Sequence, residues 1–324
     1  QMAGQGNPAG VVLLPHKTND VSWMKTVAKE YNLSETTFIW PLGGGGDNDD
    51  KSNNNDIKVV RYRIRFFTPD GTEVDLCGHA TLAAAAVLFE QQQQQQQQQE
   101  EESAVESIVF SANKDELRAF LAAKQDPKDS TKAATATTTK QMMISMDFPR
   151  KQLHEVTETD PVLDMMYAAF PHISQDMFRE GIVYIGLDQD GNDLFIELVP
   201  HVFEQLGFSG IRFEAFLSYH GYSRGIILCT TTTSQHDENN KEEVDFLSRF
   251  FGPKAGINED PVTGSAHCTL APYFAAKLGK ETIVGHQTSM RGGIVKCLVS
   301  ENRVTIIGTA ITTMSGNLLV YPDE

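Results

Sequence analysis

A short stretch in the last third of the chain combines acidic, turn-forming and small residues in front of an apolar segment. Glu259 and Asp260 precede Pro261, and Gly264-Ser265 leads into the apolar run of residues 267–278. The first backbone N–H groups of a helix have no partner inside the helix, and they favour an anion. The stretch therefore predicts a helix N-terminus directed at a carboxylate, an enolate or a phosphate.

The chain contains nearly the same pattern twice. Arg65-Phe66-Phe67 leads to Gly78-His79-Ala80, and Arg249-Phe250-Phe251 leads to Gly264-Ser265-Ala266. A single glycine before a helix often reflects only turn geometry, but its recurrence in the same context favours a functional reason. We expect two pseudo-symmetric domains, each with an apolar helix behind the glycine step, and both helix N-termini directed into one cleft between the domains.

Three titratable side chains are candidates for the chemistry. Glu35 lies in a polar triplet between Leu33 and Phe38, where a carboxylate can act as a reversible acid and base, although most glutamates are simply exposed. His79 falls in the first turn of an apolar helix, as either a structural residue or a donor. Asp260 is kept out of helical geometry by the following proline, and it either caps the next turn or faces a substrate.

The cysteines suggest two further types of site. Cys77 and His79 could form a nucleophilic pair, but a two-residue spacing into a helix does not make the side chains converge. A racemase with two thiol bases would need a second cysteine at the mirrored position, where the repeat has Thr263. His267-Cys268 lacks a second ligand pair at metal spacing, so we predict no metal site.

Composition narrows the classes of partner and compartment. The 324 residues carry 27 Lys and Arg against 43 Asp and Glu, a net charge of −16, which disfavours nucleic acid as a partner. The four cysteines show neither paired metal-ligand spacing nor a disulfide framework, which favours a reducing cytoplasm as the compartment. Neither a membrane span nor a signal peptide is predicted. The sequence enters a Gly-Asn-Pro turn by Gly6, so we expect a leading strand to be missing from it.

Low-complexity segments and a proline divide the chain. We expect a first domain of residues 1–149 plus 312–324 and a second domain of residues 150–311. Solvated insertions are expected at residues 43–56, 91–102 and 126–139 in the first domain and 234–242 in the second, with the Gln-rich insertion following a helix that ends at Phe89. A helix is expected at residues 22–31, with Ser22 as its N-cap, and a last strand at residues 317–321.

Taken together, these motifs resemble the phenazine biosynthesis-like (PhzF-like) family, whose members share the diaminopimelate epimerase-like fold. The matching segments lie in order along almost the whole chain: Gly6-Asn7-Pro8-Ala9-Gly10, Ser34-Glu35-Thr36, Phe67-Thr68-Pro69, Cys77-Gly78-His79-Ala80-Thr81, Glu259 to Ala266, and Arg291-Gly292-Gly293. The resemblance implies an α+β fold of two domains, each a curved, mostly antiparallel sheet around a central apolar helix.

The resemblance also implies an isomerase without metal or organic cofactor and a frequent homodimer. In it, Glu35 matches the general acid/base, while His79, Asp260 and Ser265 match residues that bind or polarise a small carboxylate substrate. Gly78, Gly264 and Asn7 are further expected contacts of that substrate. Two rival functions remain: an amino-acid epimerase or racemase using Cys77, and a non-catalytic binding or regulatory protein on the same fold.

Overall fold

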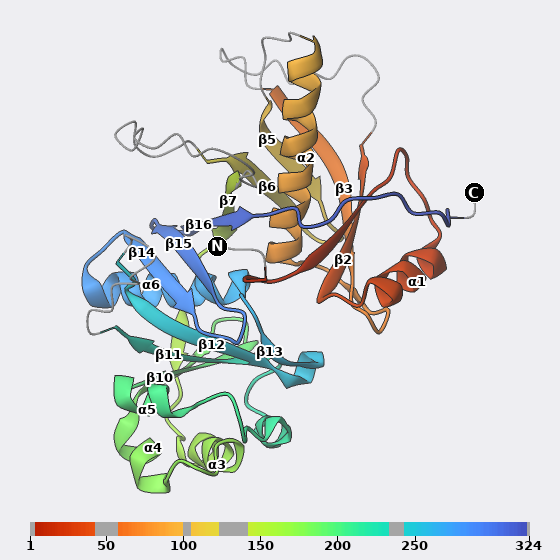
Figure 1. Cartoon of the computed structure of the whole chain (residues 1–324). Helices are drawn as coiled ribbons and strands as arrows, with labels where there is room; N and C mark the ends of the chain where they lie inside the picture. Colours follow the sequence, from red (N-terminus) through yellow and green to blue (C-terminus); the bar gives the residue numbers. More distant parts are fainter. Residues whose placement is uncertain (1–3, 43–57, 100–104, 123–141, 233–242, 323–324) are drawn as a thin grey trace. The chain divides into compact units, whose positions relative to one another are not determined.

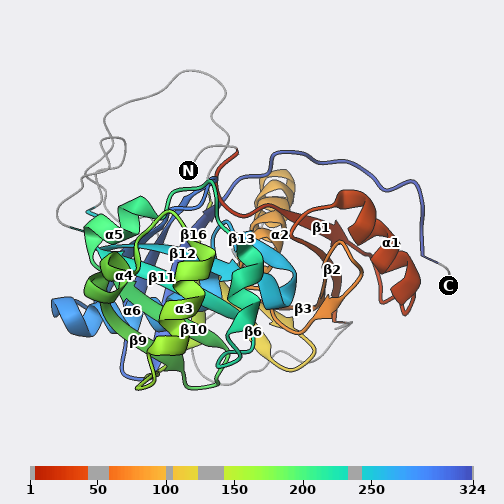
Figure 2. The same cartoon turned by 90° about the horizontal axis from the view of Figure 1, so that it is seen from below.

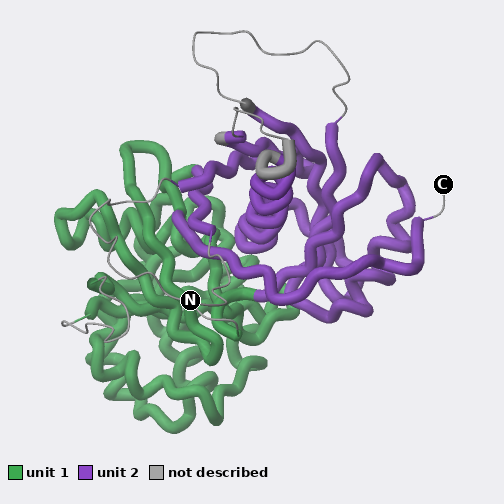
Figure 3. The backbone as a smooth tube through the Cα atoms, turned by 45° about the horizontal axis from the view of Figure 1, so that its top comes forward, with its two compact units in different colours: residues 1, 3–7, 148–306 green, residues 2, 8–147, 307–324 purple. Residues whose placement is uncertain are grey.

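The computed structural model describes residues 4–42, 58–99, 105–122, 142–232 and 243–322 (Figure 1, and Figure 2 from below). The chain divides into two compact units (Figure 3). Where described, unit 1 comprises residues 4–7 and 148–306, and unit 2 comprises residues 8–147 and 307–322. Residues 4–7 were expected in the first domain, but they associate with unit 1, where Gly6 N donates to Gly292 O over 2.9 Å.

Unit 2 is built on a mostly antiparallel sheet with the strand order β1-β2-β3-β5-β6-β7. The pairs β1–β2 and β3–β5 are parallel, whereas the other pairs, including the short β4 beside β3, are antiparallel. The elements are β1 (Ala9–Leu13), α1 (Val21–Tyr31), β2 (Glu35–Pro41), β3 (Lys58–Phe67), β4 (Glu73–Val74), α2 (Gly78–Gln99), β5 (Val105–Ser111), β6 (Glu116–Leu121) and β7 (Met142–Pro149).

Unit 1 repeats this topology. Its strands follow the order β10-β11-β12-β14-β15-β16, with the short β13 beside β12 and with β10–β11 and β12–β14 as the parallel pairs. These elements are β10 (Asp193–Leu198), β11 (Gly225–Thr231), β12 (Phe246–Gly252), β13 (Ile257–Asp260), α6 (Gly264–Leu278), β14 (Thr282–Gln287), β15 (Gly293–Val299) and β16 (Arg303–Ala310). Before the repeat come β8 (Leu153–Glu155), α3 (Asp160–Ala169), α4 (Gln175–Gly181) and β9 (Ile182–Asp188), and α5 (Pro200–Gln205) follows β10.

Each repeat encloses an apolar helix that starts at a glycine (Figure 1). Helix α2 contacts β1, β2, β5 and β6, and Ala80, Ala84 and Ala85 on it are fully buried. Small side chains let strands approach the helix closely, and alanine has the highest helix propensity. Helix α6 ends at Leu278 and is capped by Gly279, whose φ of 66° is a left-handed conformation that glycine adopts without strain. The predicted α+β class is confirmed.

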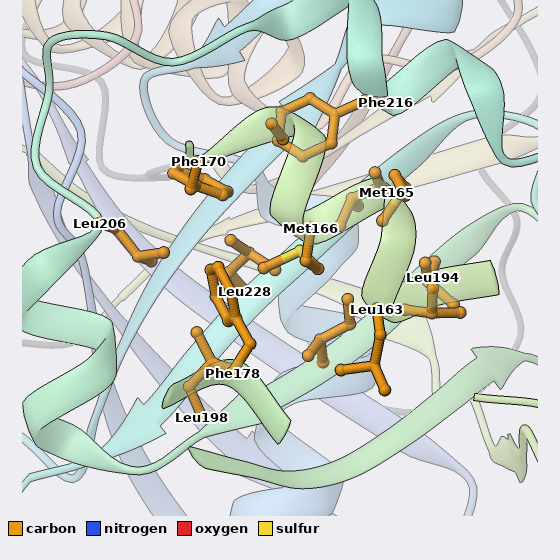
Figure 4. Packing of buried hydrophobic residues seen from close by; sticks show 14 of the residues in the cluster. Leu163, Met165, Met166, Phe170, Phe178, Leu194, Leu198, Leu206, Phe216 and Leu228 are labelled. Carbon is orange, nitrogen blue, oxygen red and sulfur yellow. The ribbon is translucent and has the colours of Figure 1, made fainter. Parts of the chain in front are cut away.

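Unit 1 has an additional apolar core on the side of α3, α4 and α5 (Figure 4). Phe170, Phe178 and Phe216 are fully buried there and pack with Met166 and Leu228. The aromatic rings pack edge-on or tilted. The ring centroid of Phe170 lies 5.9 Å from that of Phe216 and 6.1 Å from that of Phe178. This layer fixes the ends of β10 and β11 that carry site residues.

Several expected elements differ from the structure. The helix predicted to end at Phe89 continues as α2 to Gln99, because glutamine is itself a good helix former once a helix has begun. Residues 317–321 form no strand; instead Trp23 Nε1 donates to Val320 O over 3.1 Å. Asp20, not Ser22, caps α1 by accepting from Trp23 N. Helices α3 and α4 were not predicted.

The other expected insertions, at residues 43–56, 126–139 and 234–242, lie outside the described residues, as do residues 100–102. Among the described parts of the chain, no helix combines the length and apolar character needed to cross a membrane. All four cysteines, Cys77, Cys229, Cys268 and Cys297, are free thiols in buried positions.

Candidate active site

Helix α2 and strand β2 bring two of the predicted residues together in unit 2. Glu35 is the first residue of β2 and His79 is the second residue of α2. Glu35 Oε2 lies 3.1 Å from His79 Nε2, and Glu35 is only 8% exposed. Strand β2 is part of the sheet and helix α2 packs against it, so this contact is made by regular secondary structure rather than by loops.

Cys77 completes this group, which we call the Glu35 cluster (Glu35, Cys77 and His79). Its Sγ lies 3.4 Å from His79 Nδ1, so both imidazole nitrogens face a partner. Burial raises the pKa of the Cys77 thiol, which keeps it protonated near neutral pH. Burial also opposes a charged imidazole, but Cys77 and Glu35 outweigh it and raise the pKa of His79 well above its ordinary value. Because only a thiolate would attract the imidazolium and the thiol stays protonated, the Glu35 carboxylate is the partner that favours a charged His79. The raised pKa favours an imidazolium whose Nε2 faces the Glu35 carboxylate.

The same three side chains have the ligand types of a metal site. One ligand atom from each lies within 4.8 Å of the others, which makes the cluster the place where a divalent ion such as zinc could bind. An ion bound to His79 would replace one of the contacts that the imidazole makes to Cys77 or Glu35. A charged imidazole cannot ligate a metal, so the raised pKa of His79 favours the hydrogen-bonded arrangement.

A second group of polar residues, the Asp260 cluster (Asn7, Asp260, Thr263 and Gln287), lies in unit 1. Asn7 Nδ2 donates to Asp260 Oδ1 over 2.7 Å, and the Thr263 hydroxyl donates to Asp260 Oδ2. Gln287 Nε2 donates to the Asp260 carbonyl over 2.7 Å, and Gln287 Oε1 accepts from Thr263 N. Asp260 is only 7% exposed, so the network holds a buried carboxylate in one orientation at the start of α6.

The neighbouring Glu259 has a different role. Its two carboxylate oxygens accept from Arg249 Nε and Nη2 over 2.7 and 2.8 Å. In unit 2, Glu73 makes the same two contacts to Arg65, each over 2.7 Å. The repeated bidentate pair ties each Arg-Phe-Phe strand to the short strand that precedes its helix. Glu259 is therefore a structural residue, separate from Asp260.

Ser265 has a partner that the sequence reasoning did not identify. Arg224 Nη1 donates to Ser265 Oγ over 2.9 Å, while Arg224 Nε donates to the buried Asp193 over 2.8 Å. An arginine only donates, so Ser265 Oγ must accept and its own hydrogen remains for another acceptor. The Thr263 side chain makes no capping bond to α6, and Gly264 has open space where a Cβ would stand.

The repeat could have revealed Arg224. Glu35 pairs with Ala9 in the β1–β2 ladder, and Gly225 pairs with Asp193 at the equivalent place in the β10–β11 ladder. Arg224 thus stands next to the position that matches Glu35, and Ser265 matches His79. A Cβ on Gly225 would lie 2.3 Å from the Phe250 ring, so no larger residue fits there without movement of the ring.

His267, on the first turns of α6, is a buried histidine rather than a ligand. Its Nδ1 donates to Thr263 O over 2.8 Å, and Nε2 has no hydrogen-bond partner among the described residues. Burial lowers its pKa to about 4. It is therefore neutral at physiological pH and packs beside Phe246.

Because of the lowered pKa of His267, we expect the stability of the folded protein to decrease in acid. The unfolded chain takes up a proton below about pH 6.5, whereas folded His267 does so only near its pKa of about 4. The free energy of unfolding is therefore expected to fall as pH drops through this window, by about 2 kcal/mol at about pH 5 from this residue. Urea unfolding at about pH 7 and about pH 5 measures the change, and His267→Asn, which keeps a donor without titrating, should show a smaller one. Equal pH dependence in both proteins would contradict the assignment.

The predicted residues thus fall into two sets. Glu35, Gly78 and His79 lie in unit 2, whereas Asn7, Asp260, Gly264 and Ser265 lie in unit 1. Direct contacts join Glu35 to His79 and Asn7 to Asp260. Three residues that were not predicted as site residues contact members of these sets within the same unit. Cys77 contacts His79, Thr263 donates to Asp260, and Arg224 donates to Ser265.

Comparison with known proteins shows which protein family the chain is similar to. A family model described as phenazine biosynthesis-like protein matches residues 1–187 and 216–316. An uncharacterized isomerase from Halalkalibacterium halodurans is 34% identical over 322 residues, covering 98% of this chain and 94% of the relative. A human phenazine biosynthesis-like domain-containing protein is 31% identical over 329 residues, with 98% and 94% covered.

Solved structures agree. A PhzF-family protein from Enterococcus faecalis matches with a TM-score of 0.67 and 30% identity, covering 96% of this chain and 92% of the other. A predicted epimerase from Pseudomonas aeruginosa, 16% identical, shares the fold with a TM-score of 0.60 over 96% of this chain and 95% of the other. The chain therefore belongs to the phenazine biosynthesis-like (PhzC-PhzF) family, with the epimerase-like fold that the resemblance of its motifs implies.

Proposed function

We propose that the chain is an isomerase in which Glu35 moves a proton between carbon atoms of a small carboxylate-bearing substrate. The observation that carries the proposal is the contact of 3.1 Å between the buried Glu35 carboxylate and His79 Nε2 on the first turn of α2. Relatives from Halalkalibacterium halodurans and Pseudomonas aeruginosa are named uncharacterized isomerases, which supports the reaction class but names no substrate.

In the proposed reaction Glu35 takes a proton from an activated carbon and returns it to another, so the carboxylate ends as it began. The His79 imidazole faces Oε2 at 3.1 Å, which leaves Oε1 to accept the proton. Negative charge develops on the substrate as the proton leaves. The N–H groups of Gly78 and His79 at the start of α2 are suited to stabilise that charge.

We assign Asp260, Ser265 and Gly264 to substrate binding because they occupy the glycine step of the second repeat, and we add Asn7 because it donates to Asp260. Asp260 would accept hydrogen bonds from substrate hydroxyl or amino groups. Ser265, whose oxygen already accepts from Arg224, would donate to an anionic group. Arg224→Gln is then expected to raise KM more than it lowers kcat, with partial recovery in Arg224→Lys, because the change disturbs a binding hydroxyl and not the base.

A cysteine-assisted epimerase is the alternative, since Cys77 touches His79 in the same cluster. The raised pKa of Cys77 and the threonine at the matching position in unit 1 argue against a thiolate base. Cys77→Ala is therefore expected to retain most solvent-proton exchange into a converted substrate, measured by proton NMR in deuterium oxide on a panel of small carboxylic acids. Loss of exchange on the scale of about 10²-fold or more would favour the epimerase instead.

A further inference from the structure

Unit 2 contains a second candidate site on the face of its sheet opposite the Glu35 cluster. Side chains alternate between the two faces of a strand, so Trp40 of β2 lies on the face away from Glu35. Trp40 pairs across the sheet with Arg63, and Phe38 pairs with Arg65. Trp40, Arg63 and Arg65 line a cavity of about 320 Å³, a volume that suits a small molecule.

Positive charge exceeds negative charge in this cavity. Lys17, Arg63 and Arg65 line it together with a single carboxylate, Glu73. Arg65 is paired with Glu73 through Nε and Nη2. Arg63 instead donates to neutral groups, the carbonyls of Ser111 and Ala112 and the side-chain oxygen of Asn113. Lys17 forms neither an ion pair nor a hydrogen bond with any residue that the structure describes.

The cavity also has a surplus of hydrogen-bond donors. Trp40 is only 4% exposed, yet its indole N–H finds no acceptor in the described part of the chain. The nitrogen is not enclosed by protein atoms, and an indole can only donate, so this N–H is available to an acceptor in the cavity. Glu73 is already used, since it accepts from Asn113 as well as from Arg65. What the cavity lacks is a second negatively charged acceptor besides Glu73.

We propose that this cavity binds a small oxyanion, a carboxylate or phosphate group, at a site separate from the Glu35 cluster. The ligand would accept from Lys17 Nζ, from the uncommitted N–H groups of Arg63 and Arg65, and from Trp40. The backbone carbonyls and Glu73 hold the two guanidinium groups in place before the ligand arrives, which lowers the cost of binding. The site does not depend on the proposed isomerase reaction.

Trp40 supplies a direct readout because the chain has two tryptophans, Trp23 and Trp40. In a Trp23→Phe protein, fluorescence reports on the cavity alone. Titration with inorganic phosphate, and separately with acetate, at constant ionic strength set by sodium chloride, is expected to give a saturable change for at least one of them. The anion that saturates identifies phosphate or carboxylate as the recognised group.

Lys17→Gln tests the site against general charge effects. Loss of one charged donor is expected to weaken binding by about tenfold or more, whereas Lys29→Gln on α1, which removes the same charge outside the cavity, should leave it unchanged. If Trp23→Phe disturbs folding, the two lysine variants can be compared in the protein that keeps both tryptophans. The measured quantity is then the rise in unfolding temperature that each anion causes. No saturable response, or equal weakening by both lysine variants, would overturn the proposal.

Discussion

Replacing Glu35 with glutamine is expected to slow the conversion of a substrate, and the incorporation of solvent deuterium into it, by about 10² to 10⁴-fold. Glutamine keeps the shape of the side chain and an oxygen for His79 Nε2, which now lies 3.1 Å from the carboxylate, but it cannot carry a proton between two carbons. The loss should therefore appear mainly in kcat. Proton NMR in deuterium oxide measures both the exchange and the isomer formed.

A matched variant separates this effect from a change in charge. Glu30→Gln, on an exposed position of α1, removes one carboxylate without touching the Glu35 cluster, so its exchange rate should match the unmodified protein. Circular dichroism and the unfolding temperature would verify that both variants are folded. Full deuterium incorporation by Glu35→Gln would remove Glu35 from the chemistry.

The two repeated ion pairs are expected to differ strongly in what they contribute to stability. The Arg249 side chain is 3% exposed and Glu259 is 13% exposed, whereas Arg65 and Glu73 are 16% and 24% exposed. Glu259→Ala leaves a guanidinium buried without its partner, which costs about 3 to 5 kcal/mol. Glu73→Ala leaves a charge that water can reach, and the loss should be nearer about 1 kcal/mol. The midpoints of urea unfolding, compared side by side, give both values.

Double variants identify the cause of the loss. Arg249→Met with Glu259→Leu removes both charges and fills the space with apolar groups, so much of the stability lost in Glu259→Ala should return. The same double change at Arg65 and Glu73 serves as the comparison in unit 2. A larger loss from Glu73→Ala than from Glu259→Ala would show that burial does not govern these pairs.

Much of this organisation was already present in the repeated sequence. The Arg-Phe-Phe segments and the glycine steps predicted two copies of one topology, and the structure has the same strand order with the same two parallel pairs in each unit. Glu73 and Glu259 also occupy equivalent places in the two units, because each pairs with the arginine of its Arg-Phe-Phe segment. Local pattern was sufficient here because both copies show the same residues at corresponding positions.

Other features depend on contacts that no local pattern contains. Arg224 gains its place from the buried Asp193 and from Ser265, which lie 31 and 41 positions away.

Helix α3 was missed although the sequence contained its signal, because Val162, Met166 and Ala169 recur at helical spacing behind Pro161. Helix α4 has only seven residues, which are too few to show a periodic pattern. The Gln-rich tract was taken for an insertion from its composition, which carries no information on whether a preceding helix will extend through it.

The glycine at position 225 has a consequence for how the two copies have diverged. In unit 2 the first residue of the second strand bears the proposed base, Glu35, whereas the Phe250 ring fills the corresponding space in unit 1. A carboxylate side chain at this position would require the Phe250 ring to move or to be replaced by a smaller side chain. The two repeats therefore share one strand topology, but their side chains have diverged. Packing around Gly225 leaves no room in unit 1 for the residue type that unit 2 has at Glu35, so the two copies are not interchangeable in function.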